Sequence, residues 1–182
     1  MLAAIEGHEH VSRLLVTAGA NLNARDARGD TPLLWASRNA HWRTVAVLIE
    51  GGAEMDVADE GGRTPLQHAA CDGHVGTVKA LLEKGARPGQ ADQLGATSLM
   101  IAAQRGHADV VGELLAKFAD PDQCDQGGWT PLIIAAQEGH EKIATALIGA
   151  GAKICLRNGS GYSPLMIAAS AGHARRALIH YV

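Results

Sequence analysis

The sequence has few aromatic residues and no excess of positive charge. Only 3% of its 182 residues are aromatic, with a single phenylalanine among them, whereas 47% are hydrophobic. A core of this composition must be built mainly from alanine, leucine, isoleucine and valine. The net charge of −3 and the pI of about 6.3 lack the basic excess typical of domains that bind nucleic acids or anionic membranes. We therefore expect no nucleic-acid partner.

Signals for membrane insertion, secretion and disulfide bonding are also missing. No apolar run approaches the roughly 18 residues that indicate a membrane span, and Met1 is not followed by a basic and then apolar signal peptide. The three cysteines, Cys71, Cys124 and Cys155, are odd in number and do not resemble a disulfide framework. The sequence predicts no membrane insertion, reduced thiols and a cytoplasmic location.

Motifs of catalysis and of metal binding are absent as well. The chain contains no G-x-S-x-G, no glycine-rich phosphate loop, no H-E-x-x-H and no C-x-x-C. His8-Glu9-His10 holds the only close pair of histidines, and such a pair alone does not make a metal site, which needs two to four ligands that converge on one point. We expect no enzyme, no cofactor and no metal site.

What the chain does have is one motif, Thr-Pro-Leu or a close variant, that recurs every 33 residues. Its copies begin at Thr31, Thr64, Thr97, Thr130 and Ser163. Pairs of small residues, a Gly-His pair and a leucine-rich segment recur with the same period. Fixed self-similarity of this length indicates a stack of supersecondary units, none of which can bury its apolar face alone. The sequence predicts a solenoid, whose function should lie on its surface.

These recurring motifs resemble the ankyrin repeat, a 33-residue unit of a hairpin turn and two helices that opens on Thr-Pro-Leu-His-x-Ala. The resemblance covers essentially all 182 residues and is closest in residues 125–156. It implies an all-α ankyrin-repeat solenoid of helix-turn-helix units with short β-hairpin loops. We expect one domain, residues 1–182, with about four full repeats between two partial ones. The expected ranges are 1–25, 26–58, 59–91, 92–124, 125–157 and 158–182.

Local chemistry predicts where the helices and turns lie. Threonine can cap a helix through its side-chain oxygen, and proline at the next position lacks the N–H that would stay unpaired. The first helix of each unit should therefore begin at Pro32, Pro65, Pro131 or Pro164. Aspartate at the start of each hairpin can accept hydrogen bonds from backbone N–H groups two residues on. We expect helices over about two thirds of the chain, above the roughly one third of an average globular protein.

Two departures from the family pattern have local consequences. The histidine of Thr-Pro-Leu-His is replaced throughout, so the hydroxyl-to-imidazole hydrogen bond of the family should be absent. The replacements are Leu34, Gln67, Met100, Ile133 and Met166. Phe118 stands where neighbouring repeats have glycine, and a bulky residue rarely adopts the left-handed conformation of that turn. We expect a local distortion there.

Six of the nine histidines share one phase of the repeat, namely His8, His41, His74, His107, His140 and His173. Metal ligands must converge on one point, whereas a repeated position spreads its residues along the stack. The resemblance implies that each imidazole begins a second helix and hydrogen-bonds nearby backbone.

Binding residues should lie at positions that recur in every repeat but hold a different residue type in each one. In ankyrin proteins, hairpin tips and exposed residues of the first helices form a partner-binding surface, which we call the concave face. The resemblance therefore implies a non-catalytic scaffold for a protein partner whose identity stays open. The hairpin candidates are Arg28, Asp30, Arg63, Trp129 and Tyr162, and the first-helix candidates are Trp35 and His68. The turn after that helix adds Arg38, Asp72, Arg105 and Glu138. For Trp35, packing on a flanking hairpin is an equal alternative, and Trp42 is expected to pack against an adjacent helix.

The chain ends suggest two further hypotheses. The first repeat lacks its hairpin, which leaves an apolar flank uncovered, so self-association through the N-terminal repeat is one expectation. Polar Arg176 and His180 replace apolar residues of the preceding repeat and could form a C-terminal cap. The alternative function is a targeting or regulatory ankyrin module of a larger protein, such as an enzyme, a channel or a ubiquitin-ligase adaptor.

Overall fold

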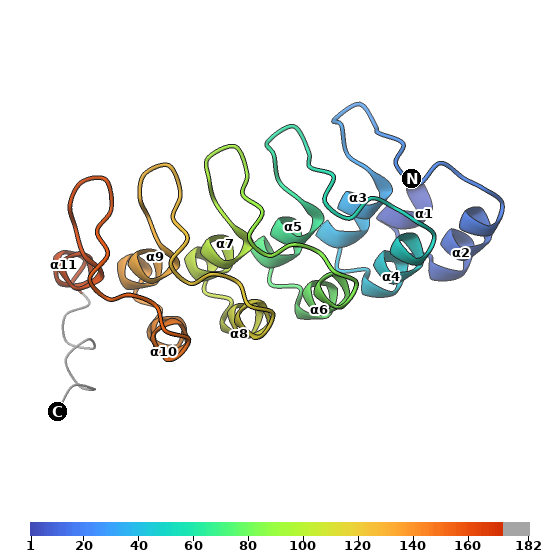
Figure 1. Cartoon of the computed structure of the whole chain (residues 1–182). Coiled ribbons are helices and arrows are strands. Elements are labelled where there is room, and N and C mark those ends of the chain that lie inside the picture. Colours follow the sequence, from blue (N-terminus) through green and yellow to red (C-terminus); the bar gives the residue numbers. More distant parts are fainter. Residues whose placement is uncertain (173–182) are drawn as a thin grey trace.

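The protein is described here by a computed structural model, in which residues 1–172 are placed. Its helices form two rows, and the hairpins project from the first row on one side (Figure 1). The first row contains α1 (Leu2–Ile5), α3 (Pro32–Arg38), α5 (Pro65–Cys71), α7 (Ser98–Arg105), α9 (Pro131–Glu138) and α11 (Pro164–Ser170). The second row contains α2 (Glu9–Thr17), α4 (Trp42–Glu50), α6 (Val75–Glu83), α8 (Ala108–Ala116) and α10 (Glu141–Gly149).

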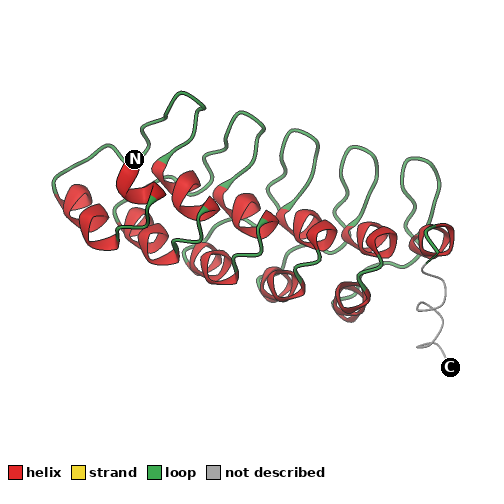
Figure 2. Cartoon of the chain, turned by 180° about the vertical axis from the view of Figure 1, so that it is seen from behind, coloured by secondary structure: helices red, strands yellow, loops and turns green. Residues whose placement is uncertain are grey.

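The expected all-α class is confirmed, but the expected helix content was too high. Helices occupy about half of residues 1–172, because an internal repeat spends seven or eight residues on its first helix and nine on its second. Loops and hairpins take the remainder of each period (Figure 2). Extended pairing in the described part of the chain is limited to one isolated bridge, between Ala91 and Thr97.

Each first helix begins as the threonine-proline pair predicts. The hydroxyls of Thr31, Thr64, Thr97 and Thr130 accept hydrogen bonds from the backbone N–H three residues on, at 3.3–3.4 Å. A cap of this kind stabilises a helix by about 1 kcal/mol. Gln67 adds to the cap of α5, because its side chain accepts from the Thr64 N–H and donates to the Ala96 carbonyl. In this repeat, glutamine supplies a polar contact where the family's histidine is missing.

Small residues allow the first helices to pack closely on one another. Ala36, Ala69, Ala102 and Ala135 are buried where neighbouring first helices meet. Larger residues such as Leu81 and Leu114 fill the space between the two rows. Because each repeat contacts only its neighbours, stability is a sum of repeat and interface contributions.

The recurring Gly-His pair acts between repeats rather than within one. The Nε2 atoms of His41, His74 and His107 lie 2.8–3.0 Å from the carbonyl oxygens of Ile5, Arg38 and Cys71, where the preceding first helix ends. Such terminal carbonyls have no partner within their own helix. The expectation that these imidazoles begin the second helices and bond nearby backbone is therefore confirmed, and the acceptors lie in the preceding repeat.

Glycine at the end of a first helix makes room for the histidine of the following repeat. A Cβ atom on Gly73 would come within 2.8 Å of the His107 ring, and one on Gly106 within 2.9 Å of the His140 ring. Both glycines also have positive φ, which costs an L-residue with a side chain about 1–2 kcal/mol. Gly and His therefore recur together because two different repeats need them at one interface.

The expected distortion at Phe118 does not occur. The residue adopts the left-handed conformation of the replaced glycine, with φ of 60°, and its side chain is 94% exposed. The Ala119 N–H still donates to the Leu114 carbonyl, as the Ala86 N–H does to that of Leu81. The turn keeps its shape and Phe118 takes up the conformational strain.

We predict that Phe118→Gly raises the free energy of unfolding by about 0.5–1 kcal/mol. Removal of a positive-φ side chain gains about 1–2 kcal/mol, and the greater flexibility of glycine in the unfolded chain offsets part of that gain. Urea unfolding followed by circular dichroism measures the change. Lys117→Gly, at a neighbouring residue with negative φ, should instead destabilise the protein. A lower midpoint for Phe118→Gly would contradict the prediction.

Candidate partner-binding surface

Each hairpin on the concave face is shaped by the residue that opens it. One side-chain oxygen accepts hydrogen bonds from two backbone N–H groups, two and four residues on, at 2.8–3.1 Å. These residues are Asp26, Asp59, Asp92, Asp125 and Asn158. The predicted turn-forming role is confirmed, and every hairpin holds its variable side chains on the same backbone frame.

Backbone hydrogen bonds join successive hairpins, with one exception. The N–H groups of Gln93, Gln126 and Gly159 donate to carbonyls in the preceding hairpin, at 2.7–3.3 Å. Among residues 1–172, no corresponding bond joins hairpins 26–30 and 59–63. Side chains connect that pair instead, beginning with Arg25, whose Nη1 donates to the Gly29 carbonyl in the first hairpin and to the Ala58 carbonyl just before the second.

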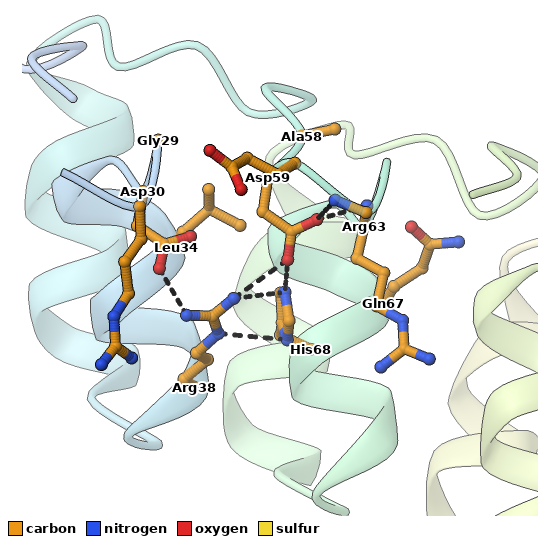
Figure 3. A network of polar contacts seen from close by, with 12 residues as sticks. Gly29, Asp30, Leu34, Arg38, Ala58, Asp59, Arg63, Gln67 and His68 are labelled. Atoms are coloured by element: carbon orange, nitrogen blue, oxygen red, sulfur yellow. Dashed lines mark hydrogen bonds and ion pairs between the residues drawn. The ribbon is translucent and has the colours of Figure 1, made fainter. Parts of the chain in front are cut away.

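The main connection at this place is a polar network centred on Arg38 at the end of α3 (Figure 3). Arg38 Nη1 lies 2.6 Å from Asp30 Oδ2, and Arg38 Nη2 lies 3.0 Å from Asp59 Oδ2. Arg38 Nε donates to His68 Nδ1 at 3.3 Å, and His68 Nε2 lies 2.8 Å from Asp59 Oδ2. One guanidinium therefore links two hairpins and the first helix of the next repeat.

The contacts of His68 fit a neutral ring that carries its proton on Nε2. In this form Nε2–H donates to Asp59 while Nδ1 accepts from Arg38. A second proton on Nδ1 would face the Arg38 donor. Burial lowers the pKa of His68, the charges of Arg38 and Arg63 lower it further, and Asp59 opposes both. Burial alone would raise the pKa of Asp59, but hydrogen bonds from the Arg63 N–H and from His68 outweigh it and lower that pKa.

We predict that stability falls as the pH drops below 6.5. His68 has its ordinary pKa of 6.5 in the unfolded chain and a lower pKa in the folded one, so the unfolded state takes up the proton first. The contribution of His68 is thus fully present above pH 6.5 and is lost as the pH approaches the folded pKa. Urea titrations at pH 7.5 and 5.5 test this. His68→Gln should reduce the pH dependence, and an unchanged dependence would contradict the prediction.

The structure brings three of the predicted binding residues together in this network. Asp30 and His68 both contact Arg38. The Asp30 and His68 side chains are only 2% and 11% exposed. Trp35 borders them: its Nε1 donates to Asp26 Oδ2 at 2.8 Å, and the Arg38 guanidinium lies 5.4 Å from its ring centroid. The Trp35 hydrogen bond lowers the pKa of Asp26. The packing alternative for Trp35 is thus supported by its contacts.

The other predicted residues lie outside the network. Arg63 forms a loose ion pair with Asp92 of the next hairpin, at 3.6 Å, and Arg28, Asp72, Arg105, Glu138 and Tyr162 are exposed. The prediction that Arg38, Asp72, Arg105 and Glu138 occupy the same position of successive repeats was wrong, because Arg38 lies one position earlier in its repeat than the other three. Cys71 occupies the Arg38 position one repeat later, and Asn39 is the equivalent of Asp72. Sequence reasoning also missed the network roles of Asp26 and Asp59, which it treated as turn residues only.

The three tryptophans have different surroundings. The Trp129 ring lies against its own hairpin, since a Cβ on Gly127 would come within 2.9 Å of Trp129 Cδ1. Neither the Trp129 indole nor the Tyr162 hydroxyl forms a hydrogen bond within residues 1–172. Trp42 is half exposed beside Gly76 of α6 and stacks with Arg43, so it packs on the adjacent helix only in part.

Three further features of the described part of the chain concern metal-ligand groups, membrane-spanning helices and disulfides. Residues 1–172 contain no group of three side chains able to hold a metal ion. No helix among these residues has the length and apolar character to cross a membrane. Cys71, Cys124 and Cys155 are free thiols. The proposed cap residues Arg176 and His180 lie outside the described residues.

Comparison with known proteins agrees with this architecture. The family model described as "Ankyrin repeats (3 copies)" matches residues 1–92 and 86–158. The chain belongs to the ankyrin repeat family. No curated protein sequence matches the chain. Ankyrin repeats are generally protein-binding modules and are typically non-catalytic. The specific binding residues of this ankyrin chain must be inferred from its own surface.

Proposed function

We propose that this ankyrin chain is a non-catalytic scaffold that binds a partner protein through its concave face. The observation that carries the proposal is the row of hairpins with one backbone frame and varied side chains. Fixed side-chain and backbone bonds hold each hairpin, while the residue before the capping position changes from Asp30 to Arg63, Ala96, Trp129 and Tyr162. A preorganised surface loses little conformational entropy on binding.

The network around Arg38 gives the predicted binding residues different roles in this proposal. Asp30 and His68 are too well covered to contact a partner directly and act by positioning Arg38. The direct contacts with the partner are then the exposed parts of Trp35 and Arg38, together with Arg28, Arg63, Asp72, Arg105, Trp129, Glu138 and Tyr162. Trp, Tyr and Arg are the residue types enriched at binding hot spots.

Site-specific photocross-linking in cell extract tests the proposal. The cross-linking residue is placed at Glu60 or Gln126 in the hairpins, and at Glu83 in the second row as the control. All three positions are exposed. We expect a partner protein to be captured from the two hairpin positions and not from Glu83. Capture from Glu83 alone would place the binding surface on the opposite side of the array.

A second candidate interaction is self-association through the N-terminal repeat. Leu14 of α2 is 71% exposed, whereas Val47, its equivalent in α4, is 3% exposed. Leu2, Val11 and Leu15 are also exposed on α1 and α2. Burial of such side chains in a second copy would contribute about 1.5–3 kcal/mol for each one fully covered.

We predict a concentration-dependent dimer that Leu14→Glu abolishes, because the charge cannot be buried unpaired. Sedimentation equilibrium measures the dissociation constant. Leu94→Glu changes a similarly exposed leucine in a hairpin, 68% against 71% for Leu14, and should leave the dimer intact. A dimer that persists in Leu14→Glu would contradict this interface.

The proposed location is the cytoplasm. Cytosolic thiol systems keep cysteines reduced, and the free state of Cys71, Cys124 and Cys155 is compatible with that setting.

A further inference from the structure

The ends of three successive first helices carry exposed charges of alternating sign. Asp72 caps the end of α5, Arg105 is the last residue of α7, and Glu138 is the last residue of α9. All three are exposed, and none of their side chains forms a hydrogen bond or ion pair within residues 1–172. We call these residues the charge row. The equivalent residue of the preceding repeat, Asn39, is by contrast engaged, since its side chain donates to the Ile5 carbonyl at 3.0 Å.

Charges elsewhere on the array commonly pair between adjacent repeats. On the opposite row, Lys79 pairs with Glu113 and Lys84 pairs with Glu50. On the hairpin side, Arg38 and Arg63 pair with aspartates of the next hairpin. The charge row alternates in sign along the same array but stays unpaired. Its members remain available for oppositely charged groups of a ligand.

The spacing of the charge row selects the conformation of that ligand. Adjacent α5, α7 and α9 pack on one another, and packed helices lie about 8–10 Å apart, so the row spans roughly 16–20 Å. A polyproline II segment presents the same face every three residues, and two such turns cover about 19 Å. A β-strand repeats its face every two residues and covers only about 13 Å in two steps. An α-helix needs two turns to pass from one repeat to the next, so it covers about 21–22 Å over the same two steps, which is longer than the row. The polyproline II segment therefore fits the row best.

We propose that the charge row binds an extended, polyproline II-like peptide segment of the partner with charges at every third position. The segment reads basic-x-x-acidic-x-x-basic, so that its charges face Asp72, Arg105 and Glu138 in turn. The sign pattern is the same in both chain directions, so either orientation satisfies it. This inference rests on the proposed function, because it specifies which partner chemistry the concave face accepts.

Three heptapeptides with blocked ends test the register by amide chemical-shift titration of the full chain. They are Lys-Pro-Pro-Glu-Pro-Pro-Lys, its charge-inverted form Glu-Pro-Pro-Lys-Pro-Pro-Glu, and the shuffled form Lys-Glu-Pro-Pro-Pro-Pro-Lys, which keeps the composition. Like charges placed opposite each other suppress binding. We expect the first peptide to bind about tenfold more tightly than the other two, and to shift amides around residues 72, 105 and 138.

A charge exchange provides the matching protein variant. Arg105→Glu should transfer the preference to Lys-Pro-Pro-Lys-Pro-Pro-Lys, whereas Glu83→Gln on the second row should leave all preferences unchanged. The exposed Arg105 side chain forms no hydrogen bond or ion pair within residues 1–172 that its replacement would break, and preserved spectral dispersion confirms folding.

Equal affinity for the first and shuffled peptides, no binding at millimolar concentration, or shifts elsewhere would each overturn the inference. If the hairpin cross-links described above still capture a partner, the proposed function survives that result. Loss of those cross-links would instead count against the proposed function itself.

Discussion

Asp59→Ala should lower the free energy of unfolding by about 3 kcal/mol, the low end of the range for removal of one member of a buried ion pair, because the Arg38–Asp59 pair is only partly buried. Asp59 Oδ1 accepts from the Gly61 and Arg63 N–H groups, and Oδ2 contacts Arg38 and His68. The substitution leaves the charge of Arg38 with Asp30 alone and leaves His68 Nε2 without its acceptor. It also weakens the connection between hairpins 26–30 and 59–63, which no backbone hydrogen bond reinforces.

Asp125→Ala is the matched control for this prediction. Asp125 makes the same two hairpin hydrogen bonds as Asp59, to Gly127 and Trp129, and forms no ion pair within residues 1–172. Its loss should cost about 1–2 kcal/mol, as for other side chains that satisfy backbone N–H groups. Urea unfolding of both variants therefore isolates a network contribution of about 1–2 kcal/mol. Equal costs for the two variants would show that the Arg38 contacts add nothing.

Local features of this fold follow from the sequence because their causes are local. Threonine and proline determine where a first helix begins, and aspartate shapes a hairpin within five residues of itself. The period of 33 residues then extends one local assignment to all repeats. The same logic overestimated helix content, since it did not include the long connection between each second helix and the next hairpin.

Contacts between repeats could not be read in the same way. Gly106 and His107 are adjacent in sequence, yet Gly106 accommodates His140 and His107 bonds the Cys71 carbonyl. Adjacent residues with a common period look like one local motif, whereas each serves a different interface.

The network of the concave face had a weaker signal in the sequence. Asp30 and Arg38 depart from their equivalents in later repeats, such as Ala96 and Gln104. Variation at a surface phase suggested partner contacts, but opposite charges that vary together can equally pair with one another. Only the structure shows that Arg38 reaches Asp59 in the next hairpin, at 3.0 Å.

The aromatic residues of the last two hairpins are where we expect the largest loss of partner affinity. Trp129→Ala combined with Tyr162→Ala should cost about 2 kcal/mol or more, which is roughly 30-fold in the dissociation constant. Each side chain has an apolar body and a polar group that forms no hydrogen bond within residues 1–172. Both can therefore serve as anchors for a partner.

Stability should change little in this double variant, and that difference separates binding from folding. Asp125 and Asn158 hold the two hairpins through backbone N–H groups, which alanine retains. Calorimetry with the purified partner that cross-linking identifies measures affinity, and urea unfolding measures stability. Trp42→Ala is the control, because it removes a half-exposed tryptophan at the start of α4, away from the hairpins, and should leave affinity unchanged. A strong fall in the unfolding midpoint with intact affinity would make Trp129 and Tyr162 structural residues and would move the binding surface elsewhere.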